Sequence, residues 1–496
     1  MTASSQSSPP PTIPASAREV LNLIDGAWQP ARSGRTLSRE NPARADRIVA
    51  VCPASDAGDA GAAVAAARAA AAGWAATPVE DRIAVLGRAL ELLESRAEAL
   101  AVADVLESGK TLADCQGEIA RALAATAYQL KIAPDLLSHV RTLEADLDVE
   151  MTRAPVGVAV LVTPWNYPFS AVLRKSVPAL VAGNAVVVKP SELTPVTAEM
   201  TGRALMEAGL PAGVYNLVFG TGTEAGQPLL DHPDVDAISF TGSTRVGFQV
   251  AELAGARDVK VQVETGGKNP LVVLADADLD RALDAAVAAS YTAAGQWCIA
   301  TSRILVEEPV FEEFRDRFVA RTREVRVGDG LDPDADMGPV SSRVQYDKVL
   351  SYLTPGALSG TVLVGGGPAE GAELPDGYYI APTVIDRPAL DSPIVQEEIF
   401  GPVVALLSVA SLEEAIALAN GTPYGLCAAI FTGDRDRGRR FAQAVDAGRV
   451  GINLPTSVGD LRVPGGGRKN SGRGEYEGAG DGIAFFTHLK PIFFAG

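Results

Sequence analysis

Val158-Ala-Val-Leu-Val162 and Ala185-Val-Val-Val-Lys189 are two short apolar runs that decide the fold class of this chain. Runs of this kind, rich in valine and without polar alternation, are typical of strands buried on both faces of a parallel sheet. Segments of helical composition follow them at residues 170–181 and 194–208. Because parallel strands need crossover helices, this alternation predicts an α/β fold with a doubly wound, Rossmann-like sheet.

The alternation extends in both directions and predicts two α/β domains. In the first series, strands are expected at 214–218, 237–240 and 260–263, with helices at 223–230 and 244–253. In the second, strands are expected at 303–306, 361–364, 382–385, 403–407 and 428–431, with helices at 309–325, 346–353 and 412–419. Upstream, strands at 22–28 and 48–53 precede helices at 56–76, 79–94 and 96–108, and a fourth helix from residue 118 ends before Pro134.

Two segments outside this alternation predict a small β arm for oligomerisation. Residues 140–153 have the composition of an exposed hairpin, and residues 483–490 that of a strand whose edge requires a partner. We expect both to pair between subunits of a homodimer or homotetramer. The predicted organisation is a disordered tail at 1–16, a dinucleotide-binding domain at 17–136 and 154–263, a catalytic domain at 264–467, and oligomerisation strands at 137–153 and 478–496.

Composition excludes several classes of partner. The formal charge of −18 argues against nucleic acid and anionic membranes, although a local basic pocket for a small anion stays compatible with it. No apolar run reaches the ~18 residues of a membrane span. The four cysteines lie far apart in the chain, and the Ser/Pro-rich start lacks the features of a signal or transit peptide. These features predict a cytoplasmic protein with reduced cysteines.

Three motifs at predicted strand ends could bind a dinucleotide. Gly220-Thr-Gly222-Thr-Glu-Ala225 fits a glycine-rich phosphate turn, and an ordinary strand-to-helix turn explains it equally well. Phe240-Thr-Gly242-Ser243 offers free amides to a pyrophosphate, or simply an N-cap by Ser243. Lys189-Pro-Ser191-Glu192 could reach ribose hydroxyls, or could be a solvated strand end. Together the three point to one crevice.

A thiol, a carboxylate and an amide are candidates for catalysis. Cys298, in Gly295-Gln-Trp297-Cys298, could be a nucleophile or a core residue. Glu264 is a candidate base for it or for water. Asn166, in Pro164-Trp165-Asn166-Tyr-Pro168, could donate to an oxyanion, or its loop could be a turn fixed by two prolines. The three histidines of the chain have no suggestive neighbours, so neither a Cys-His dyad nor a metal site is expected.

These motifs closely resemble the aldehyde dehydrogenase superfamily over nearly the whole chain after the tail. Glu264 and Cys298 lie at that family's interval, 298 − 264 = 34. The resemblance rests on Pro164–Pro168, Lys189–Glu192, Phe240–Ser243, Glu264–Gly267, Gly295–Cys298, Glu397–Pro402 and the glycine-rich segment Gly466–Gly472, in the family's order.

The resemblance implies a role for each catalytic candidate. Cys298 would attack the aldehyde carbon, and Asn166 and the Cys298 amide would hold the oxyanion. Glu264 would activate the water that hydrolyses the thioester, and Lys175 would support Asn166. A coenzyme-A-acylating enzyme normally lacks such a carboxylate, and a non-catalytic descendant would be expected to lose one of the three groups, so both alternatives are less favoured.

The resemblance also implies NAD or NADP as cofactor. Lys189 and Glu398 match contacts to the two riboses, and Ser243 matches a pyrophosphate contact. Glu192 would accept from a ribose 2′-hydroxyl and repel a 2′-phosphate, which favours NAD, while Ser191 and nearby loops keep NADP an alternative. The remaining expected cofactor residues are Trp165, Gly222, Phe240, Gly242, Gly266 and Phe400.

Arg174 is the first indication of the substrate. It lies eight residues after Asn166, 174 − 166 = 8. Semialdehyde-oxidising relatives place an arginine at this position to bind the remote carboxylate of the substrate. A surface arginine on an amphipathic helix would explain the same sequence. Residues 453–456 and 466–469 resemble the branch that acts on 2-oxoglutarate semialdehyde. A carboxylated semialdehyde, of succinate or 2-oxoglutarate, is therefore the expected small-molecule substrate.

Two residues expected near the thiol are compatible with other aldehyde substrates. Gly465 replaces the family's usual aromatic residue and is expected to widen the pocket, whereas Trp297 is large and is expected to fill part of it. An aromatic or aliphatic aldehyde, oxidised with broad specificity, consequently stays an alternative.

Overall fold

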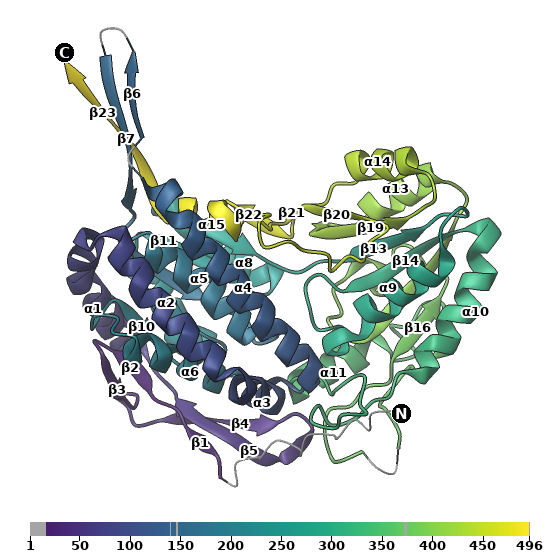
Figure 1. The fold of residues 1–496 in the computed structure, drawn as a ribbon. Coiled ribbons are helices and arrows are strands. Elements are labelled where there is room, and N and C mark those ends of the chain that lie inside the picture. The colour runs from purple at the N-terminus through teal and green to yellow at the C-terminus, as the bar shows by residue number, and fades with distance from the viewer. Residues whose placement is uncertain (1–15, 139, 145–146, 372–373, 496) are drawn as a thin grey trace, which may run out of the picture.

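A parallel sheet of the expected kind forms the first lobe of the protein. The structure is a computed structural model that describes residues 16–138, 140–144, 147–371 and 374–495, so all but Ser16 of the expected disordered tail lies outside the described residues. In Figure 1 this lobe runs from purple to teal, and a second, largely green lobe contains another sheet. The chain thus has the α/β fold that its sequence predicts.

The first sheet has the strand order β22-β12-β11-β8-β9-β10-β2-β3. Its central strands β12, β11, β8, β9 and β10 pair in parallel. The chain runs from β8 through β9 to β10 on one side and returns to β11 and β12 on the other, which puts the switch in strand order between β8 and β11. The strands are β2 (Asn22–Ile24), β3 (Ala27–Gln29), β8 (Val158–Val162), β9 (Ala185–Lys189), β10 (Tyr215–Leu217), β11 (Ala237–Thr241), β12 (Lys260–Glu264) and β22 (Gly472–Gly474).

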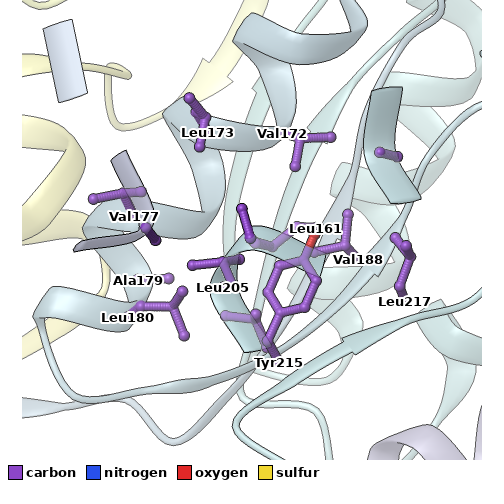
Figure 2. Close-up of a cluster of buried hydrophobic side chains, with 14 of the residues drawn as sticks. Leu161, Val172, Leu173, Val177, Ala179, Leu180, Val188, Leu205, Tyr215 and Leu217 are labelled. Carbon is purple, nitrogen blue, oxygen red and sulfur yellow. The ribbon is translucent and has the colours of Figure 1, made fainter. Parts of the chain in front are cut away.

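Helices cover both faces of this sheet, because successive strand side chains point to opposite faces. On one face, α5 (Pro168–Val181) and α6 (Pro195–Glu207) bury their apolar side chains, and Figure 2 shows Val172, Val177 and Leu180 in the same cluster as Leu161 and Val188. On the other face lie α1 (Ala57–Ala76), η1 (Gly222–Gly226), α7 (Gln227–Asp231) and α8 (Thr244–Ala256).

Three further helices pack outside α5 and α6, namely α2 (Val79–Ser95), α3 (Ala97–Ser108) and α4 (Leu112–Leu137). The prediction that Pro134 ends the fourth helix was wrong, because α4 continues through it to Leu137. Proline costs that helix one amide hydrogen bond, but Ala133 and Leu137 on either side are buried and hold the last turn in place.

The polar segment near the N-terminus also contains a strand that its composition concealed. Strand β5 (Arg44–Pro53) begins earlier than expected and pairs with β4 (Thr36–Asn41) in a three-stranded sheet with β1 (Arg18–Glu19).

The second lobe is built on a sheet with the order β15-β16-β17-β14-β13-β19-β20. All its neighbours are parallel except β15 with β16. The strands are β13 (Asn269–Val273), β14 (Thr301–Glu307), β15 (Thr361–Val364), β16 (Thr383–Asp386), β17 (Val403–Val409), β19 (Cys427–Phe431) and β20 (Arg449–Ile452). The helices are α9 (Leu279–Tyr291), η2 (Thr292–Gly295), α10 (Glu308–Glu324), α11 (Arg343–Tyr352), α12 (Pro393–Gln396), α13 (Leu412–Asn420) and α14 (Arg435–Ala444). A short ladder joins β18 (Tyr424–Gly425) to β21 (Arg468–Lys469).

A three-stranded ribbon projects from the first lobe (Figure 1). The expected hairpin is present as β6 (Val140–Glu144) and β7 (Leu147–Pro155), and β7 pairs along its whole length with β23 (Thr487–Ala495) of the same chain. The C-terminal strand begins later than predicted, because residues 483–485 end the helix α15 (Ala479–Phe485), where Ile483 and Phe485 are buried. None of the described helices is long and apolar enough to cross a membrane.

Candidate active site

Cys298 lies in the connection between α9 and β14, which has an unusual backbone. Ala293, Ala294 and Gly295 all have positive φ, at 52°, 54° and 69°. At Gly295 a Cβ atom would overlap the carbonyl oxygen of Gly401, so only glycine fits there. At the other end of this segment, the Cys298 carbonyl accepts a hydrogen bond from Asn269 Nδ2 at 2.7 Å. The thiol is therefore carried on a backbone that is fixed from both sides.

The charges around Cys298 act in opposite directions on its thiol. Burial raises the pKa of Cys298 to about 11, the positive charges of Arg174 and Arg449 oppose that rise, and Glu398 and Glu264 add to it. At neutral pH the sulfur is consequently a thiol, and attack on an aldehyde needs a group that accepts its proton.

Asn166 follows β8 at the carboxyl edge of the first sheet and is buried. Its Nδ2 donates to the carbonyl oxygen of Gln296 at 2.9 Å, which places the amide beside the backbone that carries Cys298. A buried amide donor in this place suits an oxyanion that forms next to the sulfur.

Glu264 is the last residue of β12, which β11 separates from β8 in the first sheet. Burial and the negative charge of Glu477 raise the pKa of Glu264 to about 8, against the opposing effects of Arg174, Lys175 and the Gly467 amide. A carboxylate with a pKa near neutrality is well matched to accept a proton at physiological pH.

Lys175, which the resemblance assigns to the support of Asn166, has its hydrogen bonds with other residues. Its buried ammonium forms an ion pair with Glu477 Oε1 and donates to Ser239 Oγ at 2.8 Å, whereas the Asn166 amide donates to Gln296. Although burial opposes the charge of Glu477, Lys175 and Arg174 outweigh it, and the pKa of Glu477 is lowered. Glu477 is therefore the ionised carboxylate of the site, and Glu264 the one that titrates.

Glu477 and Arg449 are two site residues that the sequence did not reveal. Glu477 is one of two acidic residues that follow a glycine-rich stretch, and Arg449 begins a strand, so neither belongs to a recognisable motif. Only the fold brings the charge of Arg449 near the thiol and that of Glu477 near Glu264.

Arg174 and Lys175 are neighbours on α5 with opposite surroundings. Lys175 is buried, whereas the Arg174 side chain is 46% exposed and its Nε lies 3.6 Å from Glu477 Oε2. Arg174 is thus at the site, rather than on a remote face of the helix.

The two residues expected to shape the pocket, Gly465 and Trp297, each lie against another side chain. A Cβ atom at position 465 would lie 2.7 Å from Nη2 of Arg449, so the room left by Gly465 is largely occupied by a guanidinium. The Trp297 ring stacks on Tyr167, with centroids 6.1 Å apart and planes at 14°. The space at Gly465 is thus taken up by an arginine rather than left open.

The expected adenosine and pyrophosphate contacts gather at the carboxyl ends of the first sheet. Lys189 Nζ lies 3.2 Å from Glu192 Oε2, and Ser191 Oγ accepts from the Leu193 amide, which shapes the turn. Ser243 is the N-cap residue of α8, but its side chain makes no capping bond and is exposed. Its hydroxyl is therefore free for a ligand.

Three glycines of the cofactor set differ in what surrounds them. A Cβ at Gly242 would lie 2.6 Å from the Phe240 ring, so the backbone there packs tightly on that ring. Gly222 opens η1 and is exposed, and the other end of η1, at Gly226, is near the Lys189 side chain. At Gly266 a Cβ would overlap the Glu398 carboxylate.

The second lobe contributes Glu398 and Phe400. Glu398 Oε1 accepts from the Gly267 amide at 2.9 Å, and burial raises the pKa of Glu398. Phe400 has a positive φ of 61°, a strained conformation for this residue, and its ring meets Trp165 edge-on at 5.4 Å. Trp165 belongs to the first lobe, so this contact joins the two lobes beside the thiol.

The residues present fit a dinucleotide between the lobes. Ribose-binding candidates, a free hydroxyl at a helix N-terminus and close-packed glycines lie along the carboxyl edge of the sheet, where its strand order switches. In the part of the chain that the structure describes, no group of three or more His, Cys, Asp or Glu residues is arranged to hold a metal ion.

Comparison with known proteins agrees with this site. The model of the aldehyde dehydrogenase family matches residues 28–492. Alpha-ketoglutaric semialdehyde dehydrogenase of Bacillus subtilis (strain 168) is 39% identical over 478 residues, which cover 95% of this chain and 97% of that protein.

Solved structures show the same fold. Betaine aldehyde dehydrogenase from Staphylococcus aureus in complex with NAD+ superposes with a TM-score of 0.92 at 33% identity, over 96% of this chain and 95% of that one. HpcC from Thermus thermophilus gives a TM-score of 0.93 at 38% identity, over 96% and 93% of the two chains.

The chain therefore belongs to the aldehyde dehydrogenase family and is an NAD(P)-dependent oxidoreductase that oxidises aldehydes. The family resemblance seen in its motifs is confirmed, and so is the Rossmann-like fold class.

Proposed function

We propose that this enzyme oxidises a carboxylated semialdehyde, of the succinate or 2-oxoglutarate type, to the dicarboxylate with NAD. The observation that carries the proposal is the half-exposed guanidinium of Arg174, which is close enough to the sulfur to oppose the rise in the pKa of Cys298. A guanidinium matches a carboxylate in shape and charge. The B. subtilis relative, named for such a semialdehyde, supports it.

Acylation begins at Cys298. Its sulfur forms a bond to the aldehyde carbon while its proton passes to solvent, which leaves the Glu264 carboxylate free for the later hydrolytic step. The Asn166 amide and the Cys298 N–H donate to the oxygen that becomes negative.

Bound NAD supplies the acceptor for the hydride that leaves the substrate carbon. The chain's own part is to hold the dinucleotide: Lys189 and Glu192 at the adenosine ribose, Ser243 at the pyrophosphate and Glu398 at the second ribose. The carboxylate of Glu192 favours NAD over NADP, because it repels a 2′-phosphate.

Deacylation uses Glu264 as a base toward water. The water oxygen attacks the thioester carbon, its proton goes to Glu264, the C–S bond breaks, and the carboxylate product leaves the Cys298 sulfur. Because the oxygen in the product comes from water, coenzyme A is not required.

The test is a panel of aldehydes with NAD and NADP, followed by NADH absorbance. We expect kcat/KM for succinate and 2-oxoglutarate semialdehydes to exceed that for butanal, pentanal and benzaldehyde, and the Arg174→Ala variant to lose part of this preference. Equal efficiency on charged and neutral aldehydes would instead establish the broad-specificity alternative. Higher efficiency with NADP would overturn the assignment of Glu192.

Betaine aldehyde, named for the S. aureus neighbours, is disfavoured by the same charges. Its quaternary ammonium would face Arg174 and Arg449, both of which act on the thiol. Like charges at short range in a buried site are repulsive.

We also propose that the enzyme is a homo-oligomer in the cytoplasm. Strand β23 of the ribbon exposes Leu489, Phe493 and Phe494, which suits contact with a second copy of the chain. The four cysteines are free, as expected in a reducing compartment.

A further inference from the structure

Arg449 lies on β20, an edge strand of the second sheet. It is the first residue of β20 and is the parallel-register partner of Cys427 in β19. The Cys427 amide donates to Asn269 Oδ1 at 3.0 Å, and Asn269 Nδ2 donates to the Cys298 carbonyl at 2.7 Å. A single asparagine thus links the strand beside Arg449 to the backbone of the nucleophile.

A loop after β20 brings the guanidinium toward the same place. Nη1 of Arg449 donates to the Val458 carbonyl at 3.0 Å. Two residues earlier in this loop, Thr456 Oγ1 donates to the carbonyl of Ile299 at 2.8 Å, directly after Cys298. The loop that Arg449 holds is therefore anchored beside the nucleophile.

Gly465 forms the opposite wall, and its lack of a side chain is what admits Arg449. A Cβ at this position would lie 2.7 Å from Nη2, closer than a carbon and a nitrogen can approach without displacement. Gly465 also exchanges two backbone hydrogen bonds of 2.8 Å with Glu477, the partner of Lys175 and Arg174. The guanidinium consequently occupies the side of the site where Glu477 and Arg174 also lie.

The two arginines of the site differ in how far their charge is compensated. Arg174 Nε lies 3.6 Å from the Glu477 carboxylate. Within the described ranges, Arg449 forms no ion pair within 4 Å with a carboxylate, and a guanidinium with one carbonyl acceptor still has N–H donors to offer.

We propose that Arg449 is a specificity-determining residue. Its guanidinium, which occupies the space that Gly465 leaves, binds the remote carboxylate of the aldehyde substrate. This rests on the proposed function, since it names the group that recognises the carboxylate of that substrate. Arg174 then acts as a second positive charge, partly balanced by Glu477.

Electrostatic effects agree with this placement. Arg449 opposes the rise in pKa of both Cys298 and Cys427, so its charge is felt at the sulfur where the aldehyde must react. A short semialdehyde needs its two ends recognised close together, by the thiol and by a nearby cation.

The experiment compares Arg449→Ala with wild type on succinate semialdehyde and on butanal, which have the same chain length. We expect kcat/KM for the semialdehyde to fall about 10- to 100-fold, mainly through KM, since a charged hydrogen bond is lost, while butanal changes less than about threefold. Arg468→Ala is the matched control, because Arg468 is exposed and pairs with Asp446 on the surface.

Gly465→Ala tests the same geometry without removing the charge. Its new methyl group displaces the guanidinium, so KM for the semialdehyde should rise and that for butanal should not. In the Arg449→Ala background the same change should add little, because the group it displaces is already gone.

The outcomes separate this inference from the proposed function. If wild-type enzyme does not prefer the semialdehyde to butanal, the substrate class fails and the role of Arg449 fails with it. If wild type has the preference and Arg449→Ala keeps it, the role of Arg449 alone is overturned. Equal losses on both aldehydes, with melting temperature and NAD binding unchanged, would mean that Arg449 only holds the 453–463 loop, which also overturns it.

Discussion

At the level of single residues, the site depends on two buried carboxylates in different ionisation states. Glu477 is held as an anion by Lys175 and Arg174, while burial and the charge of Glu477 keep Glu264 easier to protonate. Like charges in one buried site push the pKa values of a pair apart. The pair therefore supplies one fixed charge and one proton acceptor.

Replacing Glu264 with Gln should separate the two halves of the reaction. The variant keeps the thiol and the oxyanion donors, so it should release a rapid burst of NADH, close to one per active site, followed by turnover slowed about 10²- to 10⁴-fold. Stopped-flow absorbance measures both phases. Cys298→Ala is the control, expected to give no burst while still binding NAD. Normal steady-state turnover by the Gln variant would remove Glu264 from the hydrolytic step.

The pKa of Glu264 also sets the pH dependence of turnover. Only its ionised form accepts a proton, and because its pKa is raised to about 8, that fraction falls as pH drops below this value. We expect kcat to rise from pH 6.5 to pH 9, approaching a tenfold change per pH unit at the acid end. In Glu264→Gln this acid limb should be absent from the residual rate. A flat wild-type profile over that range would contradict the assignment.

At the level of elements, the regular strands were predictable and the site loops were not. Apolar runs such as Val158–Val162 are buried on both faces, so composition alone identified them. The segment 292–295 has no such signal, because its positive φ angles depend on tertiary contacts, such as that of the Ala293 amide with Asp114. In the same way, the polar strand β4 exists because β5 pairs with it, and α4 passes Pro134 because its last turn is buried.

Some residues of the candidate site were predictable from the sequence and others were not. Motif residues such as Cys298, Asn166 and Glu264 could be named from the sequence, and the structure brings their backbones or charges together. Arg449 and Glu477 could not be named, because each is placed by backbone pairing, with Cys427 and Gly465 respectively, and neither pairing has a sequence motif.

The loop that carries the nucleophile should be intolerant of a single methyl group. Gly295→Ala places a Cβ against the Gly401 carbonyl oxygen at a φ of 69°, a conformation that costs alanine about 1 kcal/mol or more before any overlap. Displacing the thiol should lower kcat about 10²-fold. Gly255→Ala is the matched control, since it is exposed in α8 and a Cβ there meets nothing within 4 Å. Similar kcat values for the two variants would show that this backbone is adaptable.

At the level of the whole molecule, catalysis depends on both lobes at once. Asn166 and Glu264 come from strand ends of the first sheet, whereas Cys298 and Glu398 come from the second lobe. Contacts across the boundary, such as Trp165 with Phe400 and Asn166 with Gln296, fix their relative position. The ribbon of β6, β7 and β23 lies outside this arrangement and projects from the first lobe (Figure 1), so it needs another purpose.

We propose contact between subunits as that purpose, and the apolar side chains of β23 allow a direct test. Leu489, Phe493 and Phe494 on β23 are 55%, 62% and 42% exposed, an unusual concentration for the last strand of a chain. Burial of such a cluster against a second copy is worth ~25 cal/mol per Å², so a buried charge there should break the assembly.

Phe493→Asp should therefore shift the mass measured by light scattering from that of a dimer or tetramer to that of a monomer. Val344→Asp is the control, because Val344 on α11 is 81% exposed and lies apart from the ribbon in sequence and fold. Since the active-site residues described above come from one chain, monomeric Phe493→Asp should still bind NAD. A wild-type monomer, or an unchanged mass in the variant, would show that the ribbon does not hold subunits together.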